Sequence, residues 1–563
     1  MSLNGALQIG QSALFASSAA LQVAGNNMAN AATPGFHRRT ISLAPLGSGG
    51  VGVAGLGQGV QILNVRREVD IALQGRYRDS LSQEMRAAMD FRYASAIETL
   101  QNELSENDVS SMLSQFFNSF SELANNPSDH AMRAVVVQEG VSLAARLSSL
   151  RSDYNTVLEE VNQSLGISVS AANNILDQIA AINQQISMQE GAGSDATALR
   201  DQRDTIIDEL SQLVDISVIE KTNGSVDILV GSIPVVIGAE SRGLDLRQSM
   251  EGDSSHMSLR VGVDGTMLNV TGGAIGGLLA QRAETIEPAI EQLDRLAQEL
   301  IRQVNLLHSQ GQSETGYTSI TASAGVIDST VPLNQEGNGL AFEIGSGSFF
   351  VHVTDQATGT TTAHEVAVNG DAMSMQDLVD VINGPNGVPN VTASLGPGNK
   401  LILAADEGCE ISFSDDSAGA LLGLGVNTFF TGSNAADINV TGLLQEDPSY
   451  LAIGAGHIPG SGQTALAIAG LQDQEVDGFG GRSLREFWQE SVTSLAVKTN
   501  GAAAKAESTS LVRSSLYAQT QSVSGVSIDE ESVNLLTFQR QFQAAAKFID
   551  VIDETMETLL RMA

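Results

Sequence analysis

Residues 2–36 read SLNGALQIGQSALFASSAALQVAGNNMANAATPGF and contain no Asp, Glu, Lys or Arg. Within this stretch one set of residues recurs at alternating spacings of four and three: Leu3, Leu7, Gly10, Leu14, Ser17, Leu21, Ala24 and Met28. Such a period, about 3.5 residues, predicts a helix with a narrow stripe that packs on a partner helix. A helix on the surface of a monomer normally carries charge on its outer face. The missing charge therefore indicates either an outer face that is buried between subunits or a helix docked on its own domain.

The other end of the chain supplies a partner helix. The same alternating spacing is kept by Leu535, Phe538, Phe542, Ala545, Ile549, Ile552, Met556 and Leu559. These side chains are bulky where the first stripe is small, so the two stripes are complementary. Acidic residues 529–531 stand where the helix dipole favours negative charge. We predict a coiled-coil assembly domain formed by residues 1–50 and 526–563.

Composition limits the function classes. The chain has 563 residues, enough for roughly three to four domains, and a net charge of -36, which repels nucleic acid and anionic membranes. The single cysteine, Cys409, excludes an intramolecular disulfide and a multi-cysteine zinc site. We expect no signal peptide, no membrane-spanning segment and no nucleic-acid partner.

Charge is unevenly distributed along the chain. Residues 1–78 contain six arginines and two acidic residues, a net charge of +4, which leaves -40 for the rest. Between Arg302 and Arg482 there are twenty acidic residues and one basic residue, Lys400, in a stretch rich in Gly, Thr, Asn and Val. This composition predicts an acidic, solvated β domain.

These patterns together predict a multidomain α+β protein. Its predicted parts are the terminal coiled coil, a helical bundle body (51–215 with 274–311 and 480–525), a small β domain (216–273) and a variable acidic β insertion (312–479). The β parts are inserted within the helical body, and the terminal helices are outermost in sequence.

Motifs for catalysis and metal binding are weak. The seven histidines are scattered, with no His-Glu-x-x-His pair. The acidic residues Asp406, Glu407, Glu410, Asp415 and Asp416 could hold calcium, but they lack an EF-hand spacing, and a solvated acidic rim is the favoured interpretation. His37 beside Arg38 and Arg39 is interpreted as a contact to a neighbouring subunit rather than a base. We expect no enzyme activity, no cofactor and no bound metal.

The segment after the first helix is the most specific motif. Residues 26–39 read NNMANAATPGFHRR. This string resembles the N-terminal signature of the rod, hook and hook-associated proteins of the bacterial flagellum, in which Asn-x-Ala-Asn leads to Thr-x-Gly-aromatic and a basic residue. Residues 59–70 and 524–547 resemble further segments of that family. The long helical middle, and LRDQRD at residues 199–204 in particular, resembles the hook-associated members rather than hook protein.

The resemblance implies a function and partners. It implies a secreted structural component at the hook-filament junction of the flagellum, exported through the flagellar type III apparatus and required for filament assembly. The implied partners are further copies of the chain in a ring, hook protein, hook-associated protein 3 (FlgL), and an export chaperone at the C-terminal helix. The alternatives are a hook or distal rod protein, or a surface-exposed adhesin or enzyme.

The predicted assembly residues come from both ends of the chain. They are Leu7, Leu14, Leu21, Met28, Asn30, Thr33, Gly35, Phe36, Arg38, Leu535, Phe538, Phe542, Ile549, Ile552, Met556 and Leu559.

Overall fold

The computed structural model describes most of the chain: residues 3–46, 57–103, 108–193, 195–251, 254–456, 458 and 460–562. By its internal contacts the chain divides into two compact units, and each is described by itself. Unit 1 comprises residues 1–92, 161–283 and 500–563, and unit 2 comprises residues 93–160 and 284–499. The domain boundaries predicted above stay predictions, and residues 1, 2, 47–50 and 563 of the first domain lie outside the described ranges.

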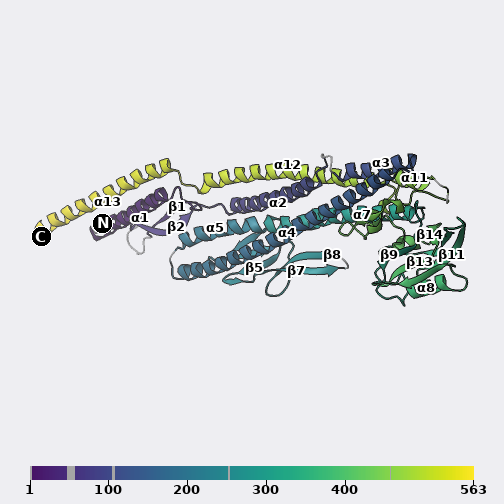
Figure 1. Cartoon of the computed structure of the whole chain (residues 1–563). Helices are drawn as coiled ribbons and strands as arrows, with labels where there is room; N and C mark the ends of the chain where they lie inside the picture. Colours follow the sequence, from purple (N-terminus) through teal and green to yellow (C-terminus); the bar gives the residue numbers. More distant parts are fainter. Residues whose placement is uncertain are drawn as a thin grey trace. The chain divides into compact units, whose positions relative to one another are not determined.

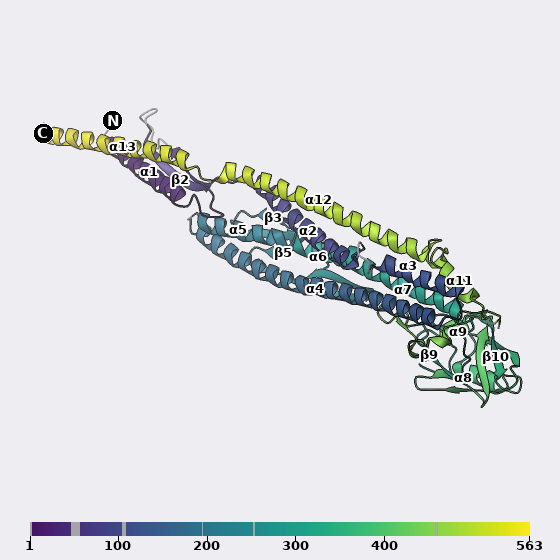
Figure 2. The same ribbon diagram turned by 45° about the horizontal axis from the view of Figure 1, so that its top comes forward.

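Unit 1 brings the two ends of the chain together. Helix α1 (Leu3–Ala29) lies along helix α13 (Ile528–Met562), and both views show the two side by side (Figures 1 and 2). A two-stranded antiparallel sheet of β1 (Arg39–Pro45) and β2 (Val60–Arg67) packs against α1. The expected pairing of the terminal helices is therefore confirmed.

The helices of unit 1 carry small sheets. Parts of α2 (Ile71–Gln101), α4 (His130–Gly191) and α12 (Leu484–Ser524) belong to this unit, together with α5 (Thr197–Leu213) and α6 (Gly273–Gln281). One sheet has the order β3-β4-β5-β6, and β7 pairs with β8. The bounds of these strands are Ser217–Glu220, Val226–Val230, Ile233–Ile237, Glu240–Ser241, Leu244–Glu251 and Ser254–Val261.

Two asparagines of α4 attach these strands to the helices. Asn183 Nδ2 donates to Val226 O (2.8 Å) and to Gly238 O (2.7 Å). Asn173 donates to Leu244 O (2.9 Å) and accepts from Leu244 N (2.7 Å). Each amide therefore satisfies backbone groups that no neighbouring strand pairs.

Unit 2 holds the acidic β insertion. Two three-stranded sheets, ordered β11-β10-β14 and β12-β13-β9, enclose an apolar core with helix α8 (Met375–Asn383). The bounds of β9 to β14 are Ser319–Gly325, Ser346–Asp355, Thr361–Asn369, Val391–Leu395, Lys400–Ala405 and Cys409–Ser414. Short elements follow: α9 (Ala420–Leu424), β15 (Phe430–Thr431), β16 (Asn439–Val440), α10 (Gly442–Glu446), the 3₁₀ turns Pro448–Tyr450 and Asp477–Phe479, and α11 (Gln463–Gly470).

The end of the insertion packs on the helices of unit 2. Phe429 contacts Phe116 and Phe120 of α3 (Val109–Asn125), with ring centroids 5.5 and 5.7 Å apart. Buried His308 of α7 (Glu287–His308) bonds Asn427 O through Nδ1 (2.8 Å). A π-helical segment, Arg282–Ile286, precedes α7. The predicted fold class, multidomain α+β with paired terminal helices, a helical body and inserted β structure, is confirmed.

Candidate functional site: the terminal helices and their charged anchor

The two terminal helices run antiparallel and approach each other closely. Near one end Asn27 of α1 donates to Glu531 Oε2 of α13 (3.1 Å). Near the other end, a Cβ added at Gly10 would lie 2.8 Å from Ile549 Cγ1. The buried residues of α1 are small or short: Gly10, Ala16, Ser17, Ala20, Ala24 and Asn27. The distance between two packed helices depends on the side chains at the contact, so these small residues allow α13 to lie close to α1.

The large residues of the predicted α1 stripe lie beside these small buried residues. Gly10, Ser17 and Ala24 of the predicted stripe are buried, but Leu7, Leu14, Leu21 and Met28 are only half-buried. The buried face of α1 is thus rotated from the predicted stripe toward Ala20 and Asn27. The bulky residues lie beside the closest approach, where the two backbones leave no room for them. Their role in contacts between subunits stays a prediction.

The predicted stripe of α13 is buried or half-buried except at its last position. Ile552 is 5 % exposed, and Leu535, Phe538, Phe542, Ile549 and Met556 are half-buried. Leu559, by contrast, is 51 % exposed. With Asn27 beside Glu531 and Gly10 beside Ile549, Leu559 lies beyond the described part of α1.

The turn after α1 has the shape that its sequence predicts. Asn30 N donates to Asn26 O (3.1 Å), Thr33 N to Asn30 O (2.9 Å) and Phe36 N to Thr33 O (3.2 Å). Thr33 is exposed and Asn30 is half-buried. The Arg39 guanidinium lies 4.9 Å from the centre of the Phe36 ring, a cation-π contact. These contacts end the helix and direct the chain toward β1.

Gly35 is required in this turn for two reasons. Its φ of 74° is in the left-handed region, and an added Cβ would collide with Thr205 Oγ1 of α5. We expect Gly35→Ala to lower the free energy of unfolding by about 1–3 kcal/mol, measured by urea unfolding. Gly193 has a similar φ of 84° but no atom within 4 Å of an added Cβ, so Gly193→Ala isolates the backbone cost. An equal loss in both variants would contradict the packing role of Gly35.

Arg38 connects the turn to the start of α13. Its Nε donates to Glu531 Oε1 (2.9 Å), and its Nη1 lies 3.2 Å from Glu530 Oε2. Its backbone N donates to Ser524 O at the end of α12 (2.8 Å). Asn27 bonds the backbone of Arg39 in both directions, through N (3.0 Å) and O (2.8 Å). The acidic start of α13 thus binds the basic turn directly, besides its expected effect on the helix dipole.

A row of carboxylates on α5 binds residues 37–39, β2 and the first turns of α2. Asp201 accepts from His37 Nδ1 (2.9 Å), Arg39 Nη2 (3.0 Å) and Arg67 Nη1 (2.9 Å). His37, which we interpreted as a contact to a neighbouring subunit, is buried and bonds a carboxylate of its own chain, and its contact to another subunit stays a prediction. We call this row, with its partners, the charged anchor. Its members are His37, Arg39, Arg67, Gln74, Arg78, Asp201, Asp204 and Asp208.

The other two carboxylates continue the row. Asp204 bonds Arg67 Nη1 (2.7 Å) and Arg78 Nη2 (3.3 Å), and Asp208 bonds Arg78 Nε (2.6 Å). Burial tends to raise the pKa of Asp204, but the charges of Arg67 and Arg78 outweigh it and lower that pKa. Asp208 has fewer cationic partners, so burial dominates and raises its pKa. Along one face of α5, the carboxylates of the helix thus alternate with arginine side chains from β2 and α2.

The string at residues 199–204 also supplies two arginines that bind elsewhere. Arg200 Nε donates to Glu190 Oε1 (2.7 Å), and its Nη1 bonds Glu220. Arg203 is 2 % exposed and donates through Nη1 to Asn183 Oδ1 (3.1 Å) and Gly224 O (2.7 Å). Burial lowers the pKa of Arg203 to about 10. Residues 199–204 of α5 therefore connect this helix to α4, to the sheet that begins with β3, to the turn after α1 and to β2.

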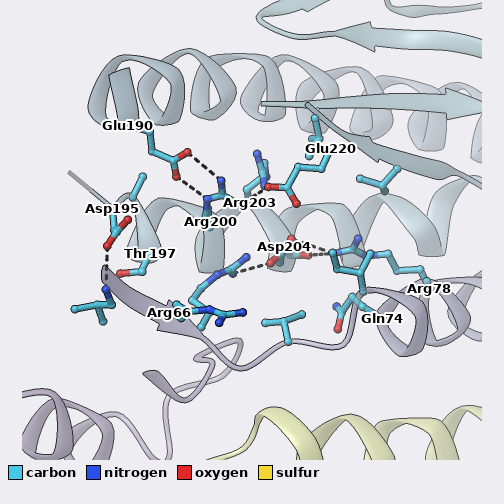
Figure 3. Close-up of a pocket in the computed structure, with 18 of the residues that line it drawn as sticks. Arg66, Gln74, Arg78, Glu190, Asp195, Thr197, Arg200, Arg203, Asp204 and Glu220 are labelled. Carbon is cyan, nitrogen blue, oxygen red and sulfur yellow. Dashed lines mark hydrogen bonds and ion pairs between the residues drawn. The ribbon is translucent and has the colours of Figure 1, made fainter. Parts of the chain in front are cut away.

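These groups form the wall of a polar cleft of about 800 Å³ between β2, the start of α2, α5 and β3. Figure 3 shows Arg200 beside Glu190, and Asp204 next to Arg78, along that wall. Asp195 accepts from Val65 N (3.0 Å) at its edge. Arg67, Arg78 and Arg200 of the lining are held in ion pairs with carboxylates of the same chain, which is the geometry of a structural joint.

Sequence reasoning missed the charged anchor as a site. The available signals were the excess of arginine within residues 1–78 and the spacing of Asp201, Asp204 and Asp208, which puts three carboxylates on one helix face. The second signal alone does not identify a partner, because the arginines are more than a hundred residues away in sequence.

Two of the acidic residues considered for calcium bind backbone groups. Asp416 Oδ1 and Oδ2 accept from Ala420 N (3.0 Å) and Leu421 N (2.7 Å) and so cap α9. Glu410 Oε2 accepts from Gly316 N (3.2 Å). Across the described ranges, no group of three or more His, Cys, Asp or Glu side chains could hold a metal ion. Among the helices that the structure describes, none is long and apolar enough to cross a membrane.

Three family models match the chain. Residues 94–320 match the flagellar hook-associated protein FlgK helical domain. Residues 518–562 match the flagellar basal body rod FlgEFG protein C-terminal model, and residues 7–37 match the flagella basal body rod protein model. The two rod models thus match α13 with the end of α12, and most of α1 with the turn after it.

Curated relatives match over nearly the whole length. Flagellar hook-associated protein 1 of Escherichia coli (strain K12) is 26 % identical over 568 residues, which cover 98 % of each chain. The proteins of the same name from Salmonella typhimurium and Bacillus subtilis are 25 % and 24 % identical and also cover 98 % of this chain, and 98 % and 97 % of their own lengths. The solved flagellar hook junction protein FlgK from Burkholderia pseudomallei has a TM-score of 0.50 at 16 % identity. It covers 80 % of this chain and 100 % of its own, and this likeness concerns the fold alone.

Proposed function

Because this chain belongs to the family of flagellar hook-associated protein 1, we propose that it is the structural subunit that joins hook and filament in the bacterial flagellum. The observation that carries this proposal is the antiparallel pair of α1 and α13, whose segments match the two rod-protein models while the helical middle matches the hook-associated model. The ends thus have the features common to axial proteins, and the middle has those of the junction protein.

The proposal includes partners and a route of export. The family places the chain among components of the flagellum. We infer that copies of it form a ring between hook protein and hook-associated protein 3, after secretion through the flagellar type III apparatus. The outer face of α13 exposes Val533 and Leu536, apolar surface that an export chaperone would cover before assembly.

The family is a structural one, and the arrangement described above agrees with a non-catalytic role. Asp201, Asp204 and Asp208 are engaged by arginine, histidine or glutamine side chains of the same chain. They hold residues 37–39, β2 and the first turns of α2 on α5. We propose that the protein acts by assembly alone.

Deleting the gene in the source bacterium tests the function. We expect hooks of normal length without filaments, and restored filaments when the wild-type gene is supplied in trans. Electron microscopy of the cell surface gives the readout. Normal filaments in the deletion strain would overturn the proposal and favour a surface adhesin or enzyme.

A hook or distal rod protein is the second candidate, because rod-protein models match both ends of the chain. The same strain distinguishes it. A hook or rod role requires that deletion also removes the hooks. Bare hooks would exclude this candidate.

A further inference from the structure

An apolar groove of about 420 Å³ lies beside the paired terminal helices. One wall is α1, the other is α13, and Leu43 of β1 and Val60 of β2 close one side. Its lining residues are Ile9, Gly10, Ala13, Ala16, Ser17, Ala20, Leu43, Val60, Phe538, Gln541, Ala544, Ala545 and Phe548. None of these described residues is charged. A cavity of about 150 Å³ lined by apolar side chains already holds a benzene ring, so this groove has room for an aromatic side chain.

The same helix presents an aromatic side chain on its other side. Phe15 is 71 % exposed, although its neighbours Ala16 and Ser17 are buried. Successive helix residues are rotated by about 100°, so Phe15 points about 160° away from both Ala13 and Ser17, which line the groove. On the outer face Phe15 is flanked by exposed Gln8 and Gln11. A single copy therefore has an exposed aromatic side chain and an unfilled apolar groove that cannot meet each other.

Charge favours a second copy of this chain as the occupant. Each copy has a net charge of -36, so most of its surface repels another copy. The segment 2–36 carries no charge, and the groove has an uncharged lining. α1 can thus enter the groove of another copy without burying an ion. The groove is also continuous with the α1–α13 contact, since Gly10, Ser17 and Ala20 belong to both.

We propose that Phe15 of one copy inserts into the groove between α1 and α13 of the next copy. The two surfaces lie on different faces of one helix pair, so the contact is heterologous. A heterologous contact repeats from copy to copy and produces a ring or a helix, whereas a two-fold contact would stop at a dimer. The inference rests on the proposed function in that it assumes assembly of many copies. It adds which surfaces meet.

Cysteine cross-linking tests the contact in assembled flagella. Cys409→Ser removes the native thiol. Two differently tagged copies are then expressed together, one with Phe15→Cys and the other with Gln541→Cys in the groove. The matched control replaces Gln541→Cys by Gln539→Cys, an exposed glutamine on the same helix about 160° away from Gln541. Mild oxidation of cell-bound flagella, followed by detection of both tags in one band, gives the readout.

We expect the Phe15–Gln541 pair to cross-link at least tenfold more than the Phe15–Gln539 pair. Equal yields in the two pairs, no cross-link in cells that grow filaments, or a cross-link from position 15 only to another protein would overturn the proposal. A deletion strain with normal filaments would instead overturn the proposed function, so the two failures are distinguishable.

A second measurement does not depend on cysteine at position 15. Strains carrying Phe15→Leu and Phe15→Gln are compared by the amount of cell-bound protein relative to secreted protein. Leucine keeps an apolar side chain, and we expect a cell-bound fraction within twofold of wild type. Glutamine matches the polar neighbours of Phe15 and cannot fill the groove, and we expect at least a tenfold loss. A wild-type fraction in the Phe15→Gln strain would overturn the proposal.

Discussion

Replacing Asp201 with asparagine is expected to lower the free energy of unfolding by about 3 kcal/mol, because it leaves two half-buried guanidinium groups without their shared carboxylate. The effect should be local. Hydrogen exchange resolved by peptide should show faster exchange in α5 and in the turn at residues 30–39, and little change in α7. Glu209→Gln is the matched control, since Glu209 is exposed on the same helix and should cost less than about 0.5 kcal/mol. Equal losses in the two variants would contradict the anchor.

The same variant should change the response to acid. Burial tends to raise the pKa of Asp201, but hydrogen bonds from His37 and Arg67 outweigh it, and the pKa lies below its ordinary value. A lowered folded pKa means that the carboxylate stabilises the fold above about pH 5, and that this contribution is lost as the pH falls through the folded pKa. The raised pKa of Asp208 acts in the opposite direction. The difference in stability between wild type and Asp201→Asn should therefore shrink below about pH 4. A constant difference from pH 7 to pH 3 would contradict this assignment.

Replacing Ile552 with aspartate is expected to separate the terminal helices and abolish filament growth. Ile552 is 5 % exposed and faces α1, where a carboxylate would be buried without a cation, at a cost of several kcal/mol, roughly 3–5. Proteolysis of the purified monomer should then cleave α1 and α13 early while the fragment with α7 persists.

The neighbouring residue provides the control for this change. Val551 is 51 % exposed on the outer side of α13, and Val551→Asp introduces the same charge without burying it. We expect the termini of the Val551→Asp monomer to be cleaved at the rate of the wild-type termini. The assignment of the α13 stripe fails if the termini of Ile552→Asp are also cleaved at that rate.

The terminal helices could be predicted because their pattern is local. Spacing alone identified a stripe on α13 whose members are buried or half-buried except Leu559. The spacing misplaced the buried face of α1, because hydrophobic periodicity gives most weight to large apolar residues such as Leu14 and Leu21. In the structure the closest approach is decided by Gly10 and Ala20, whose side chains contribute little to that signal.

The charged anchor and the end of the β insertion depend on distant pairings. Asp201 and Arg67 are separated by 134 residues, and no pattern along the chain joins them. Likewise, Phe429 packs on Phe116 of α3. The acidic composition of 312–479 predicted a solvated domain and gave no sign of this aromatic contact. Composition reports on the average surface, whereas a few apolar residues decide where a domain attaches.

The hydrogen bond between Asn27 and Glu531 spans 504 residues of sequence. Synthesis makes α1 long before α13, because the helical body and the β insertions lie between them in the sequence. A contact with such a large sequence separation forms late and slowly. A chain that lacks residues 524–563 would keep every element of unit 2. The small buried residues of α1 would then be exposed, because α13 is missing. The pair of terminal helices therefore forms only in a chain that extends through α13, and a product truncated before α13 keeps α1 without its partner helix.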